Sequence, residues 1–377
     1  MVFSKKTRDK DNGVVYIGYL RPREYRTPNF CLHSHIRHIA YLAPFFGLRP
    51  IVFSPEDIDF DKGTVKGLVH VYVESGPRIV CPKCGVTHDK AQENLETSEI
   101  VIKIPKIIDN IITNDQKYAN LFKELEQISF LTRSFNYLNG KDNIYNMLNN
   151  EGRFRNILIP TKVVKVFKDV TDDINTHGNI ILKQIYSNQG KSIIFLRKDK
   201  DKFILTKGTE TKNLSSEQLN EYYNTNIANK GFISQPYIKS ITKDGEPFDV
   251  RIACWRGTEG RFFTNIYPKI GNSEGVVTNI AQGGYFMPLV PLLKKTFPDK
   301  HAQVLSKLNK LASEFPEYYC DKILKCNAYD IALDLGIDPD GNLFMFEVNS
   351  GIEMGPNPIE PNIETCKYFR FLAQKYC

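Results

Sequence analysis

Two carboxylates and one amide near the C-terminal end of the chain have the residue types and spacing of a divalent-cation site. Asp334 precedes the turn sequence DPDGN at 338–342, and Glu347 and Asn349 follow it. Side chains alternate between the faces of a strand, so Glu347 and Asn349 share a face, and the hairpin brings Asp334 beside them. Oxygen ligands of this kind suit Mg²⁺. The alternative is a solvent-facing edge of a two-layer sheet.

A lysine and a small polar loop form a second candidate group. Lys183 lies in a run of Ile and Leu, and the loop SNQGKS follows at 187–192. Backbone N–H groups of such a loop can approach phosphate oxygens closely. The spacing is not that of a Walker loop, because no helix follows. A polar hairpin loop without a ligand is the alternative interpretation.

An Asp-x-Arg sequence and a glycine pair form a third candidate group. Asp249 and Arg251 lie on one face of a predicted strand, where an arginine can hold a phosphate or a carboxylate by two hydrogen bonds. A Gly-Gly pair preceded by Asn suits a close approach of backbone to ligand. The further residues of this group are Lys269, Asn279, Gly283 and Gly284. The alternative is a surface ion pair and a turn.

A cysteine pair, Cys81 and Cys84, has the form of a zinc knuckle. A structural zinc ion needs four ligands, and one knuckle supplies two. A site could be completed by His88 together with Cys31, His33, His35 or a second chain. The alternative is a tight turn with two exposed thiols.

The composition is that of a globular protein. The chain has 377 residues with 41% hydrophobic and 25% charged residues, which excludes a largely disordered chain. The net charge of +7 is mild and suits an anionic small substrate better than a nucleic acid. We see no secretory signal and no membrane-spanning apolar stretch, and we expect the eight cysteines to be reduced thiols in a cytoplasm.

The hydrophobic pattern predicts two kinds of unit. Strand, helix and strand signals over 14–53 favour a small α/β domain at 1–105 with a Cys-pair insertion at 74–100. A connection at 106–140 leads to an α+β unit at 141–377. The predicted strands cover 14–20, 51–53, 68–73, 179–184, 191–197, 333–337 and 343–349, and the predicted helices cover 34–46, 117–128, 215–228 and 302–312.

In their order, these motifs resemble the ATP-grasp superfamily. The hairpin that carries Asp334 and Glu347-Val348-Asn349 is similar to the metal hairpin of D-alanine–D-alanine ligases and glutathione synthetases. The run from FDVR at 248–251 through NIAQGG at 279–284 to that hairpin resembles the endospore coat-associated YheC/YheD-type branch. The resemblance implies a small Rossmann-like preATP-grasp domain followed by a two-lobed ATP-grasp module, with a lid and first lobe at 141–235 and a metal-binding lobe at 236–377.

The resemblance also implies a role for each candidate residue. Arg251 and Lys269 would act on the transferred phosphoryl group, and Asp334, Glu347 and Asn349 would hold Mg²⁺, with Mn²⁺ as an alternative. Asn279, Gly283 and Gly284 would line the acceptor pocket. The residues that would bind ATP are Lys183, Gln189, Gly190, Lys191, Ser192, Gln235, Tyr237 and Ile238.

The function expected from this resemblance is an ATP-dependent carboxylate–amine ligase that releases ADP. Its partners would be an amino-acid or peptide carboxylate and an amine, without membrane or nucleic acid, in a cytoplasmic and spore-associated protein whose oligomeric state stays open. The alternative is a catalytically reduced spore-coat assembly protein that retains the fold. A third reading is a binding module that uses zinc at Cys81 and Cys84.

Overall fold

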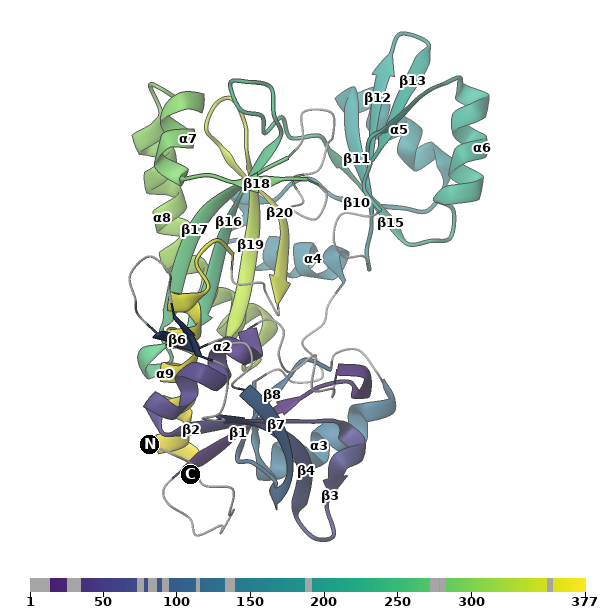
Figure 1. The fold of residues 1–377 in the computed structure, drawn as a ribbon. Helices are drawn as coiled ribbons and strands as arrows, with labels where there is room; N and C mark the ends of the chain where they lie inside the picture. Colours follow the sequence, from purple (N-terminus) through teal and green to yellow (C-terminus); the bar gives the residue numbers. More distant parts are fainter. Residues whose placement is uncertain are drawn as a thin grey trace.

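The chain is organised around three β-sheets in the part that the structure describes (Figure 1). This computed structural model describes residues 14–25, 35–72, 78–80, 87–89, 95–112, 116–132, 140–186, 192–271, 278, 283–350 and 355–377. Figure 1 shows the first sheet below and the other two side by side above it. We call these three parts the first unit, the first lobe and the second lobe, in chain order.

The first unit is a mixed sheet with a parallel centre. Strands β2, β1, β8 and β9 run parallel in that order, while β4 and its neighbours β3 and β7 extend the β2 edge antiparallel. The predicted strand–helix–strand unit is confirmed by β1, α2 and β2. The bounds are β1 Val15–Leu20, α2 His35–Leu42, β2 Leu48–Phe53, β3 Ile58–Asp59, β4 Thr64–Tyr72, β7 Leu95–Lys103, β8 Ile107–Asn110, α3 Ala119–Ile128 and β9 Phe130–Leu131.

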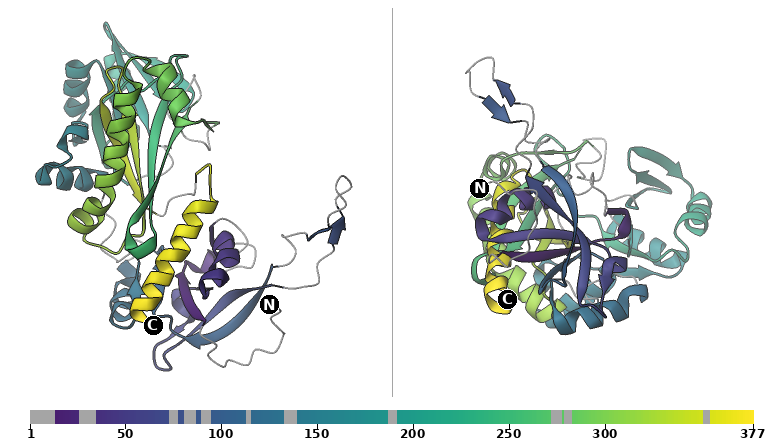
Figure 2. Two further views of the ribbon diagram at one scale, coloured as in Figure 1. Left: turned by 90° about the vertical axis from the view of Figure 1, so that its left-hand side faces the viewer. Right: turned by 60° about the horizontal axis from the view of Figure 1, so that its bottom comes forward.

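The first unit extends beyond the predicted boundary at residue 105. Strand β8 pairs with β1 and β9 pairs with β8, so both complete the first sheet. The predicted Cys-pair insertion at 74–100 overlaps the long strand β7, which pairs with β4 along its whole length. A small hairpin of β5 (Arg78–Val80) and β6 (Thr87–Asp89) stands away from the body of this sheet (Figure 2).

The first lobe is an antiparallel sheet with helices on one face. Its strand order is β10-β15-β11-β12-β13-β14, and α5 and α6 pack against it. Helix α6, predicted at 215–228, begins with a capping box in which Ser215 N donates to Gln218 Oε1 at 2.8 Å. The bounds are β10 Lys162–Val164, α5 Phe167–His177, β11 Asn179–Gln184, β12 Ile194–Asp199, β13 Lys202–Lys207, β14 Glu210–Leu214, α6 Ser216–Asn226 and β15 Phe232–Pro236.

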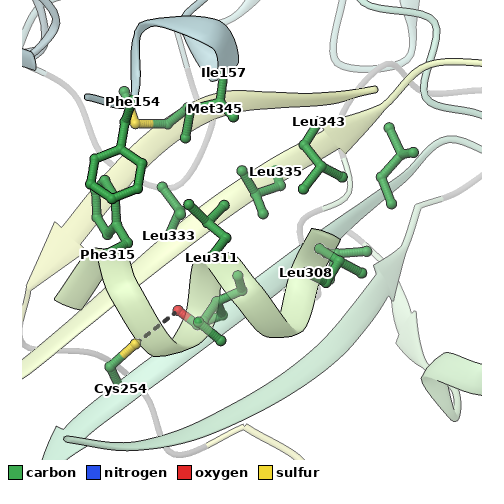
Figure 3. Packing of buried hydrophobic residues seen from close by; sticks show 14 of the residues in the cluster. Phe154, Ile157, Cys254, Leu308, Leu311, Phe315, Leu333, Leu335, Leu343 and Met345 are labelled. Carbon is green, nitrogen blue, oxygen red and sulfur yellow. Dashed lines mark hydrogen bonds between the residues drawn. The ribbon is translucent and has the colours of Figure 1, made fainter. Parts of the chain in front are cut away.

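The second lobe is an antiparallel sheet with order β18-β17-β16-β19-β20. Helices α7 and α8 pack on one face, where Leu308, Leu311 and Phe315 of α8 meet Leu333 and Leu335 of β19 (Figure 3). The predicted hairpin is confirmed as β19 and β20. The bounds are α4 Lys141–Glu151, which precedes the first lobe, β16 Phe248–Arg256, β17 Phe262–Ile270, β18 Tyr285–Phe286, α7 Leu289–Thr296, α8 His301–Tyr318, a π-helical turn Tyr319–Leu324, β19 Asp330–Ile337 and β20 Leu343–Ser350.

The C-terminal helix α9 (Ile359–Tyr376) joins the first unit by packing. Tyr368, Phe369 and Leu372 belong to the same buried cluster as Ile17 and Tyr19 of β1. The sequence-based division placed this helix with the metal-binding lobe, because chain order alone does not show which core an amphipathic helix covers. Helix α9 therefore ties the first unit to the base of the second lobe.

Candidate functional site

The second lobe carries charged side chains on the face of its sheet that α7 and α8 leave uncovered. In the β16 register, Arg251 lies opposite both Tyr267 on β17 and Asp334 on β19, and Asp249 lies opposite Lys269. The residues between them on β16, such as Val250 and Ile252, belong to the apolar core on the other face. The period of two in a strand therefore separates a charged face from an apolar one.

Asp334 is the centre of a buried ion-pair network. Arg251 donates two parallel hydrogen bonds to it, from Nε to Oδ1 and from Nη2 to Oδ2, both at 2.7 Å. Lys269 Nζ lies 3.2 Å from Asp334 Oδ1 and 3.1 Å from Asp249 Oδ1. Asp334 is only 3% exposed. The Thr278 hydroxyl donates a hydrogen bond to Asp249 Oδ2. The network thus holds two cations against two carboxylates on one sheet face.

The network shifts the pKa values of its members. Burial alone would raise the pKa of Asp334, but Lys269 and Arg251 outweigh burial and hold it well below its usual range. Burial would lower the pKa of Lys269 and Arg251, yet the facing carboxylates raise both. Asp249 differs, because burial dominates there and raises its pKa to about 6. Asp334 is therefore an anion near neutral pH, surrounded by cations.

A β-bulge turns Glu347 onto the charged face. The register passes from Leu335 opposite Met345 to Asp334 opposite Glu347, so Phe346 has no partner in the ladder. Met345 is fully buried in the apolar core, and strict alternation would have placed Glu347 on that same face. The extra residue reverses the alternation, as bulges beside functional sites commonly do. Glu347 consequently lies beside Asp334.

Asp334, Glu347 and Asn349 form a compact set of carboxylate and amide groups on the charged face. Asn349 Nδ2 donates to Asp334 Oδ2 at 3.3 Å and to Glu347 Oε1 at 2.9 Å, so one amide links the two carboxylates. Carboxylate and amide oxygens are ligands that Mg²⁺ prefers. Within the described residues no group of three or more His, Cys, Asp or Glu side chains is placed to hold a metal ion. The candidate set has two carboxylates and an amide instead.

Side chains of the first lobe and α4 reach β20 at the bulge. Lys183 Nζ donates to the Phe346 carbonyl oxygen at 2.8 Å, and the Tyr145 hydroxyl donates to the same oxygen at 3.1 Å. Lys141, the first residue of α4, lies 4.0 Å from Glu347 Oε2. Gly140 permits this approach, because a Cβ there would lie 2.7 Å from Ile185 Cγ2. Two lysines, one from the first lobe and one from α4, therefore contact β20.

Burial makes both lysines easier to deprotonate than usual. It lowers the pKa of Lys183 to about 8, with Glu347 acting in the opposite direction and Lys141 adding to the effect. Burial also lowers the pKa of Lys141, against the attraction of Glu347. Bringing charged lysines so close together and so deep costs free energy unless an anion lies between them. The pair is suited to polyphosphate.

The other residues expected to bind a nucleotide lie along β15 and its exit. Gln235 is buried and donates from Nε2 to Thr161 Oγ1 at 2.6 Å. Tyr237 N donates to the Asn179 carbonyl at 3.0 Å, and its ring meets Phe195 edge-on at 4.9 Å. Ile238 follows and packs against the core of the second lobe. These residues lie where the chain passes from the first lobe to the second.

Several predicted residues lie outside the described residues, namely Gln189, Gly190, Lys191, Asn279, Cys31, His33, Cys81 and Cys84. Ser192 belongs to the described residues and is partly exposed. Gly283 has a φ of 90°, a left-handed conformation that favours glycine, and Gly284 leads into β18. His35 begins α2 and His88 lies in β6.

The cysteines that the structure describes show no disulfide. They are Cys254, Cys320, Cys326, Cys366 and Cys377. In the described ranges no helix is long and apolar enough to cross a membrane.

The candidate site contains residues that the sequence did not reveal. Lys141 and Tyr145 lie in the polar helix α4, and no local sequence pattern indicates that they contact another lobe. Tyr267 lies across from Arg251 only through strand pairing. Asp249 was visible as part of Asp-x-Arg, but its contact with Lys269 depends on the β16–β17 register.

A family model described as "YheC/D like ATP-grasp" matches residues 128–357, which is more than half of the chain. The chain belongs to this family. The matched region begins in the first unit, spans both lobes and includes the bulged hairpin of β19 and β20. The predicted ATP-grasp fold is thereby confirmed.

Two curated relatives come from Bacillus subtilis (strain 168). The endospore coat-associated protein YheD is 22% identical over 79% of this chain and 63% of its own length, so the match leaves more than a third of that relative uncovered. The endospore coat-associated protein YheC is 21% identical over 83% of each chain. Among solved structures, the D-alanine–D-alanine ligase from Coxiella burnetii is 10% identical, with a TM-score of 0.44 over 96% of this chain and 97% of that chain.

Proposed function

We propose that the protein is an ATP-dependent ligase that joins a carboxylate to an amine through an acyl phosphate and releases ADP. One observation carries the proposal: lysines from the first lobe and α4 and a carboxylate–cation network on the second lobe face each other across β20. Lys183 reaches the Phe346 carbonyl, and Glu347 lies between Lys141 and Asn349. Such a site matches the charges of a nucleoside triphosphate with its metal ion.

The adenine and ribose would lie where the chain passes from the first lobe to the second, beside Gln235, Tyr237 and Ile238. Lys183 and Lys141 would hold the inner phosphates, and both gain a favourable anion in exchange for their burial. The loop with Gln189, Gly190, Lys191 and Ser192 would cover the phosphates. Asp334, Glu347 and Asn349 would hold Mg²⁺, which when bound neutralises phosphate charge.

The chemistry divides into two displacements. An oxygen of the donor carboxylate attacks the γ-phosphorus of ATP, the bond to the β,γ-bridging oxygen breaks, and ADP leaves. The amine lone pair then attacks the acyl carbon, the bond to the phosphate oxygen breaks, and inorganic phosphate and a proton leave. Arg251 and Lys269 would steady the negative charge of the phosphoryl group in both steps. A closed loop would exclude water from the acyl phosphate.

The substrate class we propose is an amino-acid or peptide carboxylate with an amine acceptor. Asn279, Gly283 and Gly284 would line the acceptor side, next to the Thr278–Asp249 contact. The names of the YheC and YheD relatives support an association with the endospore coat. The networked, buried charge at Asp334 speaks for retained chemistry, because an unused charge network gains nothing from its burial.

The test is a thermal melt with and without MgATP, followed by an assay of ADP release with a panel of amino acids and peptides. Ligand at about a hundred times its Kd adds roughly 2.7 kcal/mol, which raises the midpoint by about 2–4 °C. We expect this shift in the wild type and its loss in Glu347→Ala. The exposed Glu210, on β14 of the first lobe, supplies the matched control Glu210→Ala, which should behave like the wild type. A full shift or undiminished ADP release in Glu347→Ala would refute the proposal.

A further inference from the structure

The bulge in β20 interrupts the backbone hydrogen bonding of an outer strand. Strand β20 is the last strand in the order of the second-lobe sheet as the structure describes it. Its register with β19 skips Phe346, so the carbonyl groups of Met345 and Phe346 lie where the ladder is interrupted. A buried carbonyl group that lacks a donor costs free energy. The bulge therefore needs hydrogen-bond donors from outside the sheet.

Tyr145 of α4 supplies one of these donors. Its hydroxyl donates to the Met345 carbonyl and lies 3.1 Å from the Phe346 carbonyl oxygen. Tyr145 is 5% exposed and packs in the core cluster of the second lobe, so its ring is held in place. Burial raises the pKa of Tyr145 well above its usual range, which keeps the hydroxyl protonated. The side chain is therefore a fixed donor beside both carbonyl groups.

Lys183 of the first lobe supplies the other donor. Its Nζ donates to the Phe346 carbonyl at 2.8 Å and lies 5.6 Å from the centre of the Tyr145 ring. A tyrosine hydroxyl has one hydrogen to donate, and an ammonium group has three. The closer contact of Tyr145 is the one with Met345, so Lys183 serves Phe346. A core side chain and a lysine from another lobe thus share the bulge.

The two donors differ in what the proposed function asks of them. Lys183 is assigned to the nucleotide phosphates, and a lysine that turns to phosphate leaves the Phe346 carbonyl without its donor. The Tyr145 hydroxyl already lies 3.1 Å from that oxygen and can donate to it with its ring in the same place. Tyr145 is therefore the donor that stays at the bulge when the nucleotide is bound.

The bulge determines the direction of Glu347, the residue that follows Phe346. A slip of one residue in β20 carries the side chains beyond it to the opposite face of the sheet. Helix α4 contacts the strand on both sides of this point, because Lys141 at its start lies 4.0 Å from Glu347 Oε2. The contacts of α4 thus join the bulge to the charged face.

We propose that Tyr145 is a positioning residue: its hydroxyl holds the β20 bulge and so keeps Glu347 on the charged face when Lys183 turns to the nucleotide. The part that concerns Lys183 rests on the proposed function. The hold on the bulge in the nucleotide-free protein rests on the contacts alone.

The test compares Tyr145→Phe with Tyr223→Phe in the full chain. Tyr223 is also 5% exposed, and its hydroxyl donates to the Lys165 carbonyl at 3.2 Å within the first lobe. Each variant keeps its ring and loses one hydrogen bond to a backbone carbonyl, so a general loss of stability affects both. The measurements are hydrogen–deuterium exchange by mass spectrometry, with and without MgATP, and the Kd of MgATP by isothermal titration calorimetry.

Without nucleotide, we expect β20 peptides to exchange about threefold to tenfold faster in Tyr145→Phe than in the wild type, with β12 peptides unchanged. Saturating MgATP should widen this difference, because Lys183 then leaves the Phe346 carbonyl. By linkage, the Kd of MgATP should rise by about threefold to tenfold in Tyr145→Phe. Tyr223→Phe should match the wild type in β20 exchange and in Kd.

Three results separate the possible failures. Unchanged β20 exchange in Tyr145→Phe, or an equal change in Tyr223→Phe, overturns the hold on the bulge. A difference that MgATP leaves the same, with an unchanged Kd, overturns the role of Tyr145 in the nucleotide-bound protein. A wild type that does not bind MgATP refutes the proposed function and, with it, the part that concerns Lys183. The nucleotide-free comparison then still decides whether Tyr145 holds the bulge.

Discussion

The two faces of the second-lobe sheet are made by the same strands and are opposite in character. On one face Leu333 and Leu335 pack against α8 in a dry core. On the other face Asp334, between them in sequence, is equally buried but surrounded by Arg251 and Lys269. Burial is therefore shared by both faces, and only its energetic consequence differs.

The comparison separates the face that stabilises the protein from the face to which we assign ligand binding. Burying a leucine side chain contributes roughly 1.5–3 kcal/mol. Burying an ion-pair network contributes little net free energy, because desolvation offsets the attraction between the charges. Nothing in the folding free energy requires charges on the second face, so their role is best sought in binding. The following experiments break or sharpen this contrast.

The largest effect is expected from Asp334→Ala, which leaves Arg251 and Lys269 as buried cations without their shared partner. We expect a loss of about 3–5 kcal/mol in the free energy of unfolding, measured by urea titration, together with loss of MgATP-dependent ADP release. An unchanged unfolding free energy would show that the network is more solvated than its burial indicates.

On the opposite face, Leu333→Ala removes packing and leaves the charges in place. The expected loss is about 2–5 kcal/mol in the free energy of unfolding, because a cavity forms in the core. ADP release per folded molecule should stay within about twofold of the wild type. A large fall in kcat at full folding would mean that the two faces are mechanically coupled.

Lys183 offers a pH test of the charged side. Burial lowers its pKa from 10.5 to about 8, so the unfolded chain binds the proton more tightly than the native protein. The cost of burying the charged lysine is fully present below pH 8 and is relieved as the pH rises towards 10.5. Without nucleotide, the stability of the wild type relative to Lys183→Met should therefore increase by about 1 kcal/mol per pH unit in that window.

The measurement is chemical denaturation of both proteins at several pH values. A difference that is flat between pH 8 and 10.5 would contradict the lowered pKa. Saturating ATP should reduce the slope, since bound phosphates favour the charged lysine.

The smallest effect is expected from Tyr267→Phe, which keeps the ring and removes the hydroxyl that faces Arg251. We expect kcat to fall by roughly threefold to tenfold with a stability change below about 1 kcal/mol. Tyr285→Phe is the matched control, because its hydroxyl contacts Glu246 at the surface. Equal kcat values for both variants would exclude a positioning role for Tyr267.

Much of the site was visible in local patterns. The turn at 338–342 and the polar residues of an apolar strand were enough to predict a hairpin with three oxygen ligands. Ser215 and Gln218 marked the start of α6, because a capping box is a local interaction. The residues missed were those whose role depends on distant contacts. Lys141 meets Glu347 across two lobes, and no short-range pattern carries that information.

The sequence by itself determined the strand and helix content and the chemistry of the residues on each strand, because alternation, capping and turn formation act over a few residues. Only the tertiary structure decided the bulge at Phe346, which places Met345 in the core and Glu347 at the site. It also decided that α9 packs on the first unit and not on the lobe that it follows in the chain. Both outcomes depend on which surfaces far apart in the chain bury one another, and the free energy of that choice is not local.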